Sequence, residues 1–308
     1  MSKFTLLELT RRCDCFPYTR SEAEQRYGVL TPLVVDGQVV GLLLPDVVQA
    51  LKDYCASLET PLETGRTAQA PLLFTDERVG FAGHVATSEE RSALLTRILL
   101  HWRKQDRFSA LRGWRNELYP AYLLPLEHPP ADLKAPTAFV VERAGAVVLG
   151  MTTYGVHLNI YTRSGTEQGA MHARMWVARR SATKPTWPGY LDNAVAGGIP
   201  YGHSVRDAAI KECMEEASLP AEWAAKAKMV GAISYFTATD RGLAPEVQFV
   251  CDLELPDHIT LMPNDGEVVI IDFMLRHGFI DADTEPGFLE IQQRLHRRLD
   301  LSNITPLH

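Results

Sequence analysis

Residues Gly197 to Leu219 read GGIPYGHSVRDAAIKECMEEASL, and this segment is the most informative of the chain. A glycine-containing loop leads into a predicted helix that starts at Ser204 and ends near Ala217. Ser204 can cap this helix, and Asp207, three residues further on, can complete a capping box. Glutamates at positions i, i+3 and i+4 share one helical face. That face therefore presents three carboxylates: Glu212, Glu215 and Glu216.

Carboxylates at this spacing repel one another and raise each other's pKa unless something neutralises them. A hard divalent cation does so, because it takes carboxylate oxygens and leaves positions for water and phosphate oxygens. The preceding glycines allow the backbone to approach the cluster closely. Spacing alone leaves a second interpretation open, which is a solvated helix face.

The same segment resembles the Nudix box, which reads G, five residues, E, seven residues, R-E-apolar-x-E-E-x-G-apolar. Gly197 is the first glycine, and KECMEEASL at Lys211–Leu219 is the second half. The sequence departs from the box at three positions: His203 replaces the first glutamate, Lys211 the arginine and Ser218 the final glycine. Lys211 keeps the charge but lacks the forked geometry of arginine. The three helix carboxylates are intact, so catalysis is the favoured interpretation.

The flanks resemble a Nudix subfamily related to the Nudix domain associated with thiamine pyrophosphokinase. The resemblance lies in Phe139–Tyr161, Met175–Gly198 and Asp265–Val268, and Leu111–Tyr122 resembles the end of the extra N-terminal domain of that subfamily. It implies a Mg²⁺-dependent hydrolase, with Mn²⁺ as the alternative cation. The implied substrates are thiamine diphosphate and its oxo and oxy forms, cut to the monophosphate and phosphate as a metabolite-repair reaction.

Three rival functions stay open. The first is a hydrolase of the same class acting on ADP-ribose or a dinucleotide. The second is a non-catalytic Nudix-like binding module, which the departures at His203 and Lys211 favour and the intact glutamates disfavour. The third is the isomerase branch of the same fold, which needs a reactive cysteine, whereas Cys213 occupies an apolar position of the box.

The candidate metal residues are the helix carboxylates, a carboxylate after the last strand and one glycine carbonyl: Glu212, Glu215, Glu216, Glu267 and Gly197. The same three helix glutamates are the catalytic candidates, and which of them is the base is left open. Glu267 lies in DGEV, where a plain turn residue is an equal alternative. A tight turn is the equal alternative for Gly197.

Substrate binding is predicted in two places. Cations before the glycine loop can hold a diphosphate, arginine through a bidentate fork and lysine as a point charge. Side chains in YGVHLN and the nearby tryptophan can stack on a planar heterocycle or bond its edge. The candidates are Lys184, Arg179, Arg180, Tyr154, His157, Asn159 and Trp187. Surface solvation is the alternative for the cations, and core packing is the alternative for the others.

Hydrophobic patterning predicts a chain of mixed α and β structure. The predicted elements are a hairpin at Thr31–Leu44 turning at Asp36-Gly37, helices at Ser88–Gln105 and Phe288–Leu299, and strands at Ala138–Val141, Val147–Met151 and Val156–Thr162. Four prolines between Pro125 and Pro136 predict a linker. The predicted domains are 1–125 (α+β, for substrate selection or dimerisation), 126–136 (linker) and 137–308. The resemblance implies an α/β/α Nudix sandwich with a mixed sheet for the last, so the fold class is α+β.

Composition excludes several classes of protein. The chain has 308 residues, 46% of them hydrophobic, which is enough for a sizeable core. A net charge of −7 makes a nucleic-acid scaffold unexpected. No apolar run reaches the roughly 18 residues of a membrane helix. No signal peptide is evident, and the five scattered cysteines suit a reducing cytoplasm. We expect a small-molecule diphosphate as the partner, with no nucleic acid and no membrane. A homodimer is left open.

Overall fold

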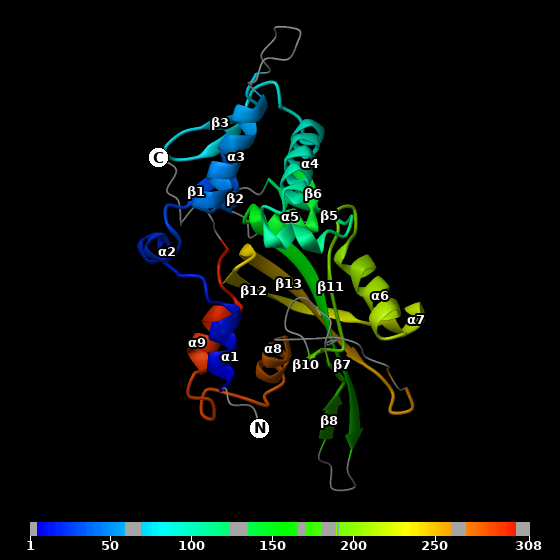
Figure 1. Ribbon diagram of the computed structural model, residues 1–308. Coiled ribbons are helices and arrows are strands. Elements are labelled where there is room, and N and C mark those ends of the chain that lie inside the picture. Colours follow the sequence, from blue (N-terminus) through cyan, green and yellow to red (C-terminus); the bar gives the residue numbers. More distant parts are fainter. Residues whose placement is uncertain are drawn as a thin grey trace. The chain divides into compact units, whose positions relative to one another are not determined.

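The computed structural model describes residues 5–58, 69–123, 135–165, 171–179, 189, 191–259, 261 and 269–299 (Figure 1). The chain divides into two compact units, each assembled from separate segments. The box unit comprises Met1–Asp14, Tyr154–Tyr235 and Val247–Arg297. The N-terminal unit comprises the remaining residues, Cys15–Thr153, Phe236–Glu246 and Arg298–His308. Most of the predicted linker falls outside the described residues, and the predicted domain limits stay predictions.

The N-terminal unit combines a small sheet with helices. Its sheet has the strand order β2-β1-β4-β3, and β5 and β6 form a separate antiparallel pair. Its elements are α2 (Arg20–Tyr27), β1 (Thr31–Val35), β2 (Gln38–Leu43), α3 (Pro45–Leu58), β3 (Leu72–Phe74), β4 (Val79–Phe81), α4 (Ser88–Lys104), a 3₁₀ helix (Ser109–Gly113), β5 (Leu118–Tyr122), β6 (Thr137–Glu142) and α5 (Arg143–Val148).

The predicted hairpin is confirmed. Strands β1 and β2 are antiparallel, and Val35 pairs with Gln38 across the turn. Both turn residues have positive φ, 50° at Asp36 and 78° at Gly37. A two-residue turn with this geometry matches the twist of the strands that it joins, which is why the Asp-Gly pair predicts a hairpin.

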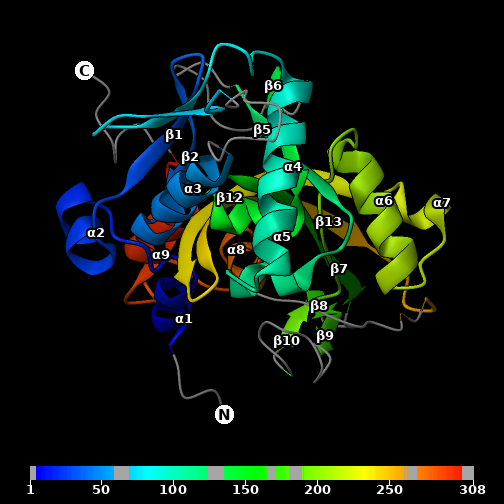
Figure 2. The same ribbon diagram turned by 45° about the horizontal axis from the view of Figure 1, so that its top comes forward.

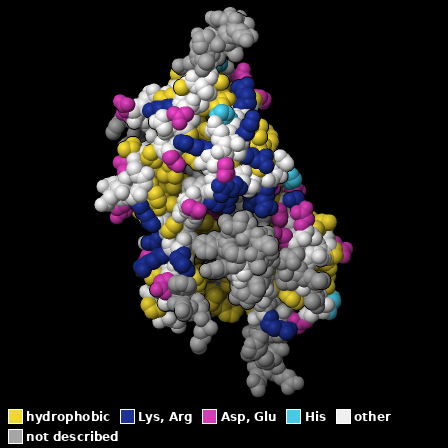
Figure 3. Space-filling model, viewed as in Figure 1, with side chains coloured by type: hydrophobic (Ala, Val, Ile, Leu, Met, Phe, Trp, Pro, Cys, Tyr) yellow, Lys and Arg dark blue, Asp and Glu magenta, His cyan; other side chains and the backbone are white. Residues whose placement is uncertain are grey.

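The long helix α4 is also confirmed, and it starts at the predicted Ser88. Thr87 is its N-cap, because its hydroxyl accepts a bond from the Glu90 N–H while Glu90 accepts one from the Thr87 N–H. Five apolar side chains of α4 are buried in the core of the unit: Leu94, Leu95, Ile98, Leu99 and Trp102. Lys and Arg side chains gather on the surface over α4 (Figure 3).

The predicted strand at Val147–Met151 is wrong, because Val147 and Val148 end the short helix α5 and the next residues form a turn. Gly145 lies so close to the Leu99 side chain of α4 that a Cβ at this position would collide with it. Gly150 follows the helix with φ of 59° and lies against the Leu42 carbonyl. The β-branched valines predict a strand, but packing against α4 decides the outcome.

The box unit is built on a second sheet. Its path is β11-β7-β13-β12, with β8 paired to β7, while β9 and β10 form a separate pair. Its elements are α1 (Leu6–Cys13), β7 (Thr153–Gly165), β8 (Met171–Met175), β9 (Val177–Arg179), β10 (Leu191–Asn193), β11 (Val195–Gly198), α6 (Val205–Glu216), α7 (Ala221–Ala224), β12 (Lys228–Thr239), β13 (Gly242–Glu254), α8 (Val269–Arg276) and α9 (Phe288–Leu295). Thr153 at the start of β7 and Phe236–Glu246, which end β12 and begin β13, fall in the N-terminal unit.

Helices cover both faces of this sheet. Helices α6 and α7 lie on one side, and α1, α8 and α9 lie on the other (Figures 1 and 2). The α+β class is therefore confirmed. Helix α9 ends at Leu295, short of the predicted Leu299. The chain leaves the helix because the residues that follow bond to β12, where the Arg297 N–H donates to the Ser234 carbonyl at 3.1 Å. No helix in the described part of the chain is long and apolar enough to cross a bilayer.

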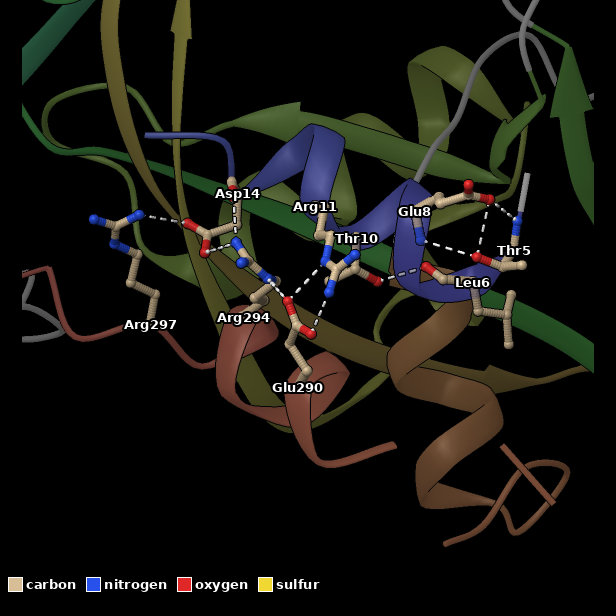
Figure 4. Close-up of polar contacts among 9 residues, drawn as sticks. All are labelled: Thr5, Leu6, Glu8, Thr10, Arg11, Asp14, Glu290, Arg294 and Arg297. Carbon is tan, nitrogen blue, oxygen red and sulfur yellow. Dashed lines mark hydrogen bonds and ion pairs between the residues drawn. The ribbon is translucent and has the colours of Figure 1, made fainter. Parts of the chain in front are cut away.

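Charged side chains join α1 to α9 on the second side of the sheet (Figure 4). The Arg11 guanidinium donates two hydrogen bonds to the Glu290 carboxylate, of 2.8 and 2.6 Å. Arg294 bonds to Glu290 at 2.8 Å and to the Asp14 carbonyl at 2.8 Å. Arg297 bonds to the Asp14 carboxylate at 3.0 Å, and both side chains are almost fully buried. We call these five residues the clasp.

Candidate functional site

Helix α6 carries the glutamates of the box and matches its predicted bounds. Ser204 is the N-cap, and the reciprocal bonds of the capping box to Asp207 are both present. One face of the helix buries small side chains, namely Ala208, Ala209 and Cys213. Small residues let the helix axis approach β11 closely, which brings the glutamates on the neighbouring face to the strand.

The Glu212 carboxylate lies directly on the backbone of Gly197 in β11. A Cβ at position 197 would collide with the carboxyl carbon of Glu212. Only 12% of the Glu212 side chain is exposed, and its Oε1 is 3.4 Å from the Lys211 ammonium. A side chain at position 197 would therefore displace the Glu212 carboxylate from this place.

Glu216, one turn further along α6, meets the same strand. Its Oε2 accepts a bond of 3.0 Å from the Ala196 N–H. The carboxylates of Glu212 and Glu216 therefore both lie against the short segment at residues 196–197. Sequence spacing predicts this pairing, because residues four apart share a helical face.

Glu215 lies differently from its two neighbours. Its side chain is 59% exposed, and its Oε2 is 3.4 Å from the Lys211 ammonium. Partial burial acts to lower the pKa of Lys211, but the nearby Glu212 and Glu215 carboxylates outweigh it and raise that pKa. Lys211 is thus a cation that neutralises part of the acidic face. Asp and Glu side chains are exposed over α6 and α7 (Figure 3).

The oxygen donors near β11 fit a hard divalent cation. Within the described ranges, no group of three or more His, Cys, Asp and Glu side chains is arranged to hold a metal ion. The donors that do come together are the Glu212 and Glu216 carboxylates and the main chain of Gly197. Carboxylate and carbonyl oxygens are the ligands that Mg²⁺ prefers, and Mg²⁺ usually keeps several waters as further ligands.

The predicted residues of β7 divide between the two faces of the sheet. Tyr154 is buried, and the alternation of side chains along a strand places it on the opposite face from His157 and Asn159. His157 is half-buried. Asn159 is fully buried, donates to Asp252 at 3.0 Å and accepts from Asn193 at 2.7 Å.

Asp252 is the centre of a polar network that the sequence does not reveal. Beside the bond from Asn159, it accepts two bonds from Arg276 of α8 and lies 3.0 Å from His277. Burial acts to raise the pKa of Asp252, but bonds from Arg276, His277 and Asn159 lower it on balance. Arg276 also bonds to Asp272 at 2.7 Å. These contacts join β7, β13 and α8, and no local spacing signals them.

Several predicted site residues cannot be placed. Glu267, Lys184, Arg180 and Trp187 lie outside the described residues. The backbone of Arg179 lies in β9, where it pairs with Leu191, but its side chain is not described. The roles predicted for all five stay predictions.

The departures from the box have distinct structural settings. His203 is exposed, in the turn before α6. Ser218 has φ of 51°, the left-handed conformation that favours the glycine of the box. Burial raises the pKa of the Cys213 thiol to about 12. A thiol with so high a pKa is a poor nucleophile at neutral pH, which disfavours the isomerase.

Comparisons with known proteins give two family matches. Residues 160–283 match the model of the NUDIX domain. Residues 5–153 match the model of a domain of unknown function, DUF4743.

Three curated proteins are similar to this chain. Nudix hydrolase 24, chloroplastic, of Arabidopsis thaliana is 30% identical, covering 88% of this chain and 74% of its own length. Nudix hydrolase 20, chloroplastic, of the same plant is 36% identical over 60% of this chain and 53% of its own length. An uncharacterized protein of Saccharomyces cerevisiae is 30% identical, covering 96% of this chain and 92% of its own length. The cytoplasmic location expected for this chain stays a prediction.

Proposed function

Because this chain belongs to the Nudix hydrolase family, we propose that it hydrolyses thiamine diphosphate, or an oxo or oxy form of it, to the monophosphate and phosphate. The family makes the chain a pyrophosphohydrolase, and the substrate is the proposed part. The observation that carries the proposal is the Glu212 carboxylate lying on the backbone of Gly197, with Glu216 beside it.

In the proposed mechanism, Glu212, Glu216 and the Gly197 carbonyl would hold Mg²⁺. When bound, this cation supplies charge stabilisation on the phosphate oxygens and lowers the pKa of a bound water. Lys211 keeps the acidic face partly neutral through its contacts with Glu212 and Glu215. The half-exposed Glu215 is free of the β11 backbone, so it can accept a proton from an attacking water, and Glu212 stays the alternative base. In this proposal, Glu267 would be a further ligand of the cation.

Recognition of the organic group is proposed on the polar face of β7. His157 is the half-buried member there, and Asn159 lies deeper, fixed by Asp252. An aminopyrimidine is a flat ring with donors and acceptors along its edge, so an imidazole and an amide suit it. The diphosphate is assigned to Lys184, Arg179 and Arg180. The resemblance of the flanking segments to the thiamine-related subfamily supports this choice over other diphosphates.

The test is a chromatographic product assay with Mg²⁺ on thiamine diphosphate, oxothiamine diphosphate and ADP-ribose. Glu216→Gln serves as the inactive variant, and Glu222→Gln, an exposed glutamate of α7, is the matched control. We expect monophosphate from the thiamine compounds with the wild type and the control only. Turnover of ADP-ribose alone would discard the thiamine substrate and keep the hydrolase. No turnover of any of the three by folded protein, with Mn²⁺ also tried, would reject the proposed substrate class.

A further inference from the structure

Two glycines on neighbouring strands lie beside the box site. Gly155 of β7 pairs with Gly198 of β11, and the next residue, Val156, pairs with Gly197. A Cβ built on Gly155 would lie 3.0 Å from the Gly197 carbonyl oxygen. The backbone at Gly155 is therefore in close contact with the carbonyl that the proposed function assigns to the cation.

The space beside Gly155 is filled by the side chain of Gln248. A Cβ at position 155 would collide with the carboxamide oxygen of Gln248, which projects from β13. Gln248 is buried, and its Nε2 donates to the Tyr235 hydroxyl of β12 at 3.4 Å. Its neighbours along β13, Val247 and Phe249, are buried apolar residues.

An amide at this position has a cost that an apolar residue would avoid. Burying a carboxamide is unfavourable unless hydrogen bonds compensate, whereas a β-branched residue would suit an interior strand. The amide oxygen lies against Gly155, and Glu212 lies on Gly197 from α6. Two polar side chains from different elements thus bear on the same short stretch of β7 and β11.

We propose that Gln248 is a positioning residue of the box site, which holds the Gly155–Gly198 pair and so fixes the place of the Gly197 carbonyl relative to Glu212. The inference rests on the proposed function, since it concerns the same cation site. Gln248 does not touch the reacting atoms. It acts through Gly155, and Tyr235 orients its amide. Residues that support metal ligands in this way typically change metal affinity 10- to 100-fold when they are substituted.

The experiment measures Mn²⁺ binding directly, by the electron paramagnetic resonance signal of free Mn²⁺ during titration of the full-length protein. Gln248→Met keeps the length of the side chain and removes the amide. We expect it to bind Mn²⁺ about 10-fold more weakly than the wild type. The half-saturating Mg²⁺ concentration for turnover should rise by the same factor, with kcat nearly restored at saturating Mg²⁺. Gln38→Met, the same change in β2, is the control and should match the wild type.

A purely structural role would lower the unfolding temperature and leave Mn²⁺ affinity unchanged, so that result in Gln248→Met overturns the inference. If Gln248→Met does not fold, Tyr235→Phe takes its place, because it removes only one hydroxyl. We expect about threefold weaker Mn²⁺ binding there, and wild-type affinity would overturn the inference. Failure of the proposed function looks different: the wild type itself would then bind no Mn²⁺ or release no monophosphate.

Discussion

The box site and the clasp both combine carboxylates with basic side chains, but the balance of charge differs between them. At the box site, Glu212 and Glu215 share one half-exposed lysine, at 3.4 Å each. At the clasp, one buried carboxylate has its own guanidinium at 3.0 Å, and a second arginine bonds to the same residue. The box site is therefore a cluster of carboxylates that retains net negative charge, whereas arginines neutralise the carboxylates of the clasp.

This difference in charge balance determines how each region responds when one of its charged side chains is removed. A buried charge pair is strongly destabilising when one partner is removed, because the other charge is left in a poorly polarisable interior. Carboxylates near the surface keep water as a partner, so their charge remains available for a cation. Removing a carboxylate of the box site should thus abolish enzymatic activity, whereas removing a carboxylate of the clasp should lower the stability of the fold. Three variants test this separation, and a fourth tests the backbone conformation after α6.

The largest effect is expected from Glu216→Gln at the box site. The change keeps the size of the side chain and removes a proposed metal ligand, so turnover of the thiamine substrate should fall by about a thousandfold. The unfolding temperature should stay within about 3 °C of the wild type, because the amide can still accept the bond from Ala196. Steady-state kinetics measure the turnover, and thermal melts measure the unfolding temperature. Near-normal turnover would remove Glu216 from the site.

The second effect is expected from Asp14→Ala at the clasp. It leaves Arg297 buried without its carboxylate and should cost about 3 kcal/mol of unfolding free energy, with kcat of the folded fraction unchanged. Urea unfolding and kinetics at low temperature measure these quantities. Asp283→Ala, on the exposed surface, is the matched control. Adding Arg297→Met to Asp14→Ala should recover much of the loss, and an equally unstable double variant would contradict the charge argument.

A smaller, pH-dependent effect is expected from Glu290→Gln. Bonds from Arg11 and Arg294 lower the pKa of Glu290 from 4.5 to about 2. A carboxyl with a lowered pKa stabilises the fold above its unfolded value, and this contribution is lost as the pH falls from about 4.5 towards 2. The variant should melt below the wild type at pH 7, and the two curves should converge over that window. A constant gap from pH 7 to pH 3 would contradict the prediction.

The smallest effect is expected from Ser218→Gly, and it is stabilising. Ser218 has the left-handed backbone after α6, where its Cβ costs about 1 kcal/mol relative to glycine. A thermal melt should show a rise of a few degrees. Ala217→Gly, at the adjacent position with φ of −112°, is the control and should destabilise. An unchanged melt for Ser218→Gly would show that the loop after α6 relaxes the strain.

Local signals predicted the local elements well. The capping box at Ser204 predicts the start of α6, and the Asp36-Gly37 pair predicts the hairpin. These features succeed because their causes lie within a few residues along the chain.

Long-range contacts were not predictable from the sequence. The Cys13-Asp14-Cys15 stretch looks incidental, yet Asp14 is the centre of the clasp. Gln248 lies in a strand-like run with nothing to mark its contact with Gly155. The partner in each case is fixed by the fold, and no propensity or spacing rule relates residues so far apart.

The clasp also constrains the order in which contacts can form while the chain is being synthesised. The bond between Asp14 and Arg297 closes a separation of 283 residues. At roughly 5–20 residues per second, a ribosome needs about 15 to 60 s to travel from the first partner to the second. Throughout that interval the carboxylate of Asp14 lacks the guanidinium that neutralises it. Helix α1 therefore acquires its contacts with α9 only after the rest of the box unit between them has been synthesised.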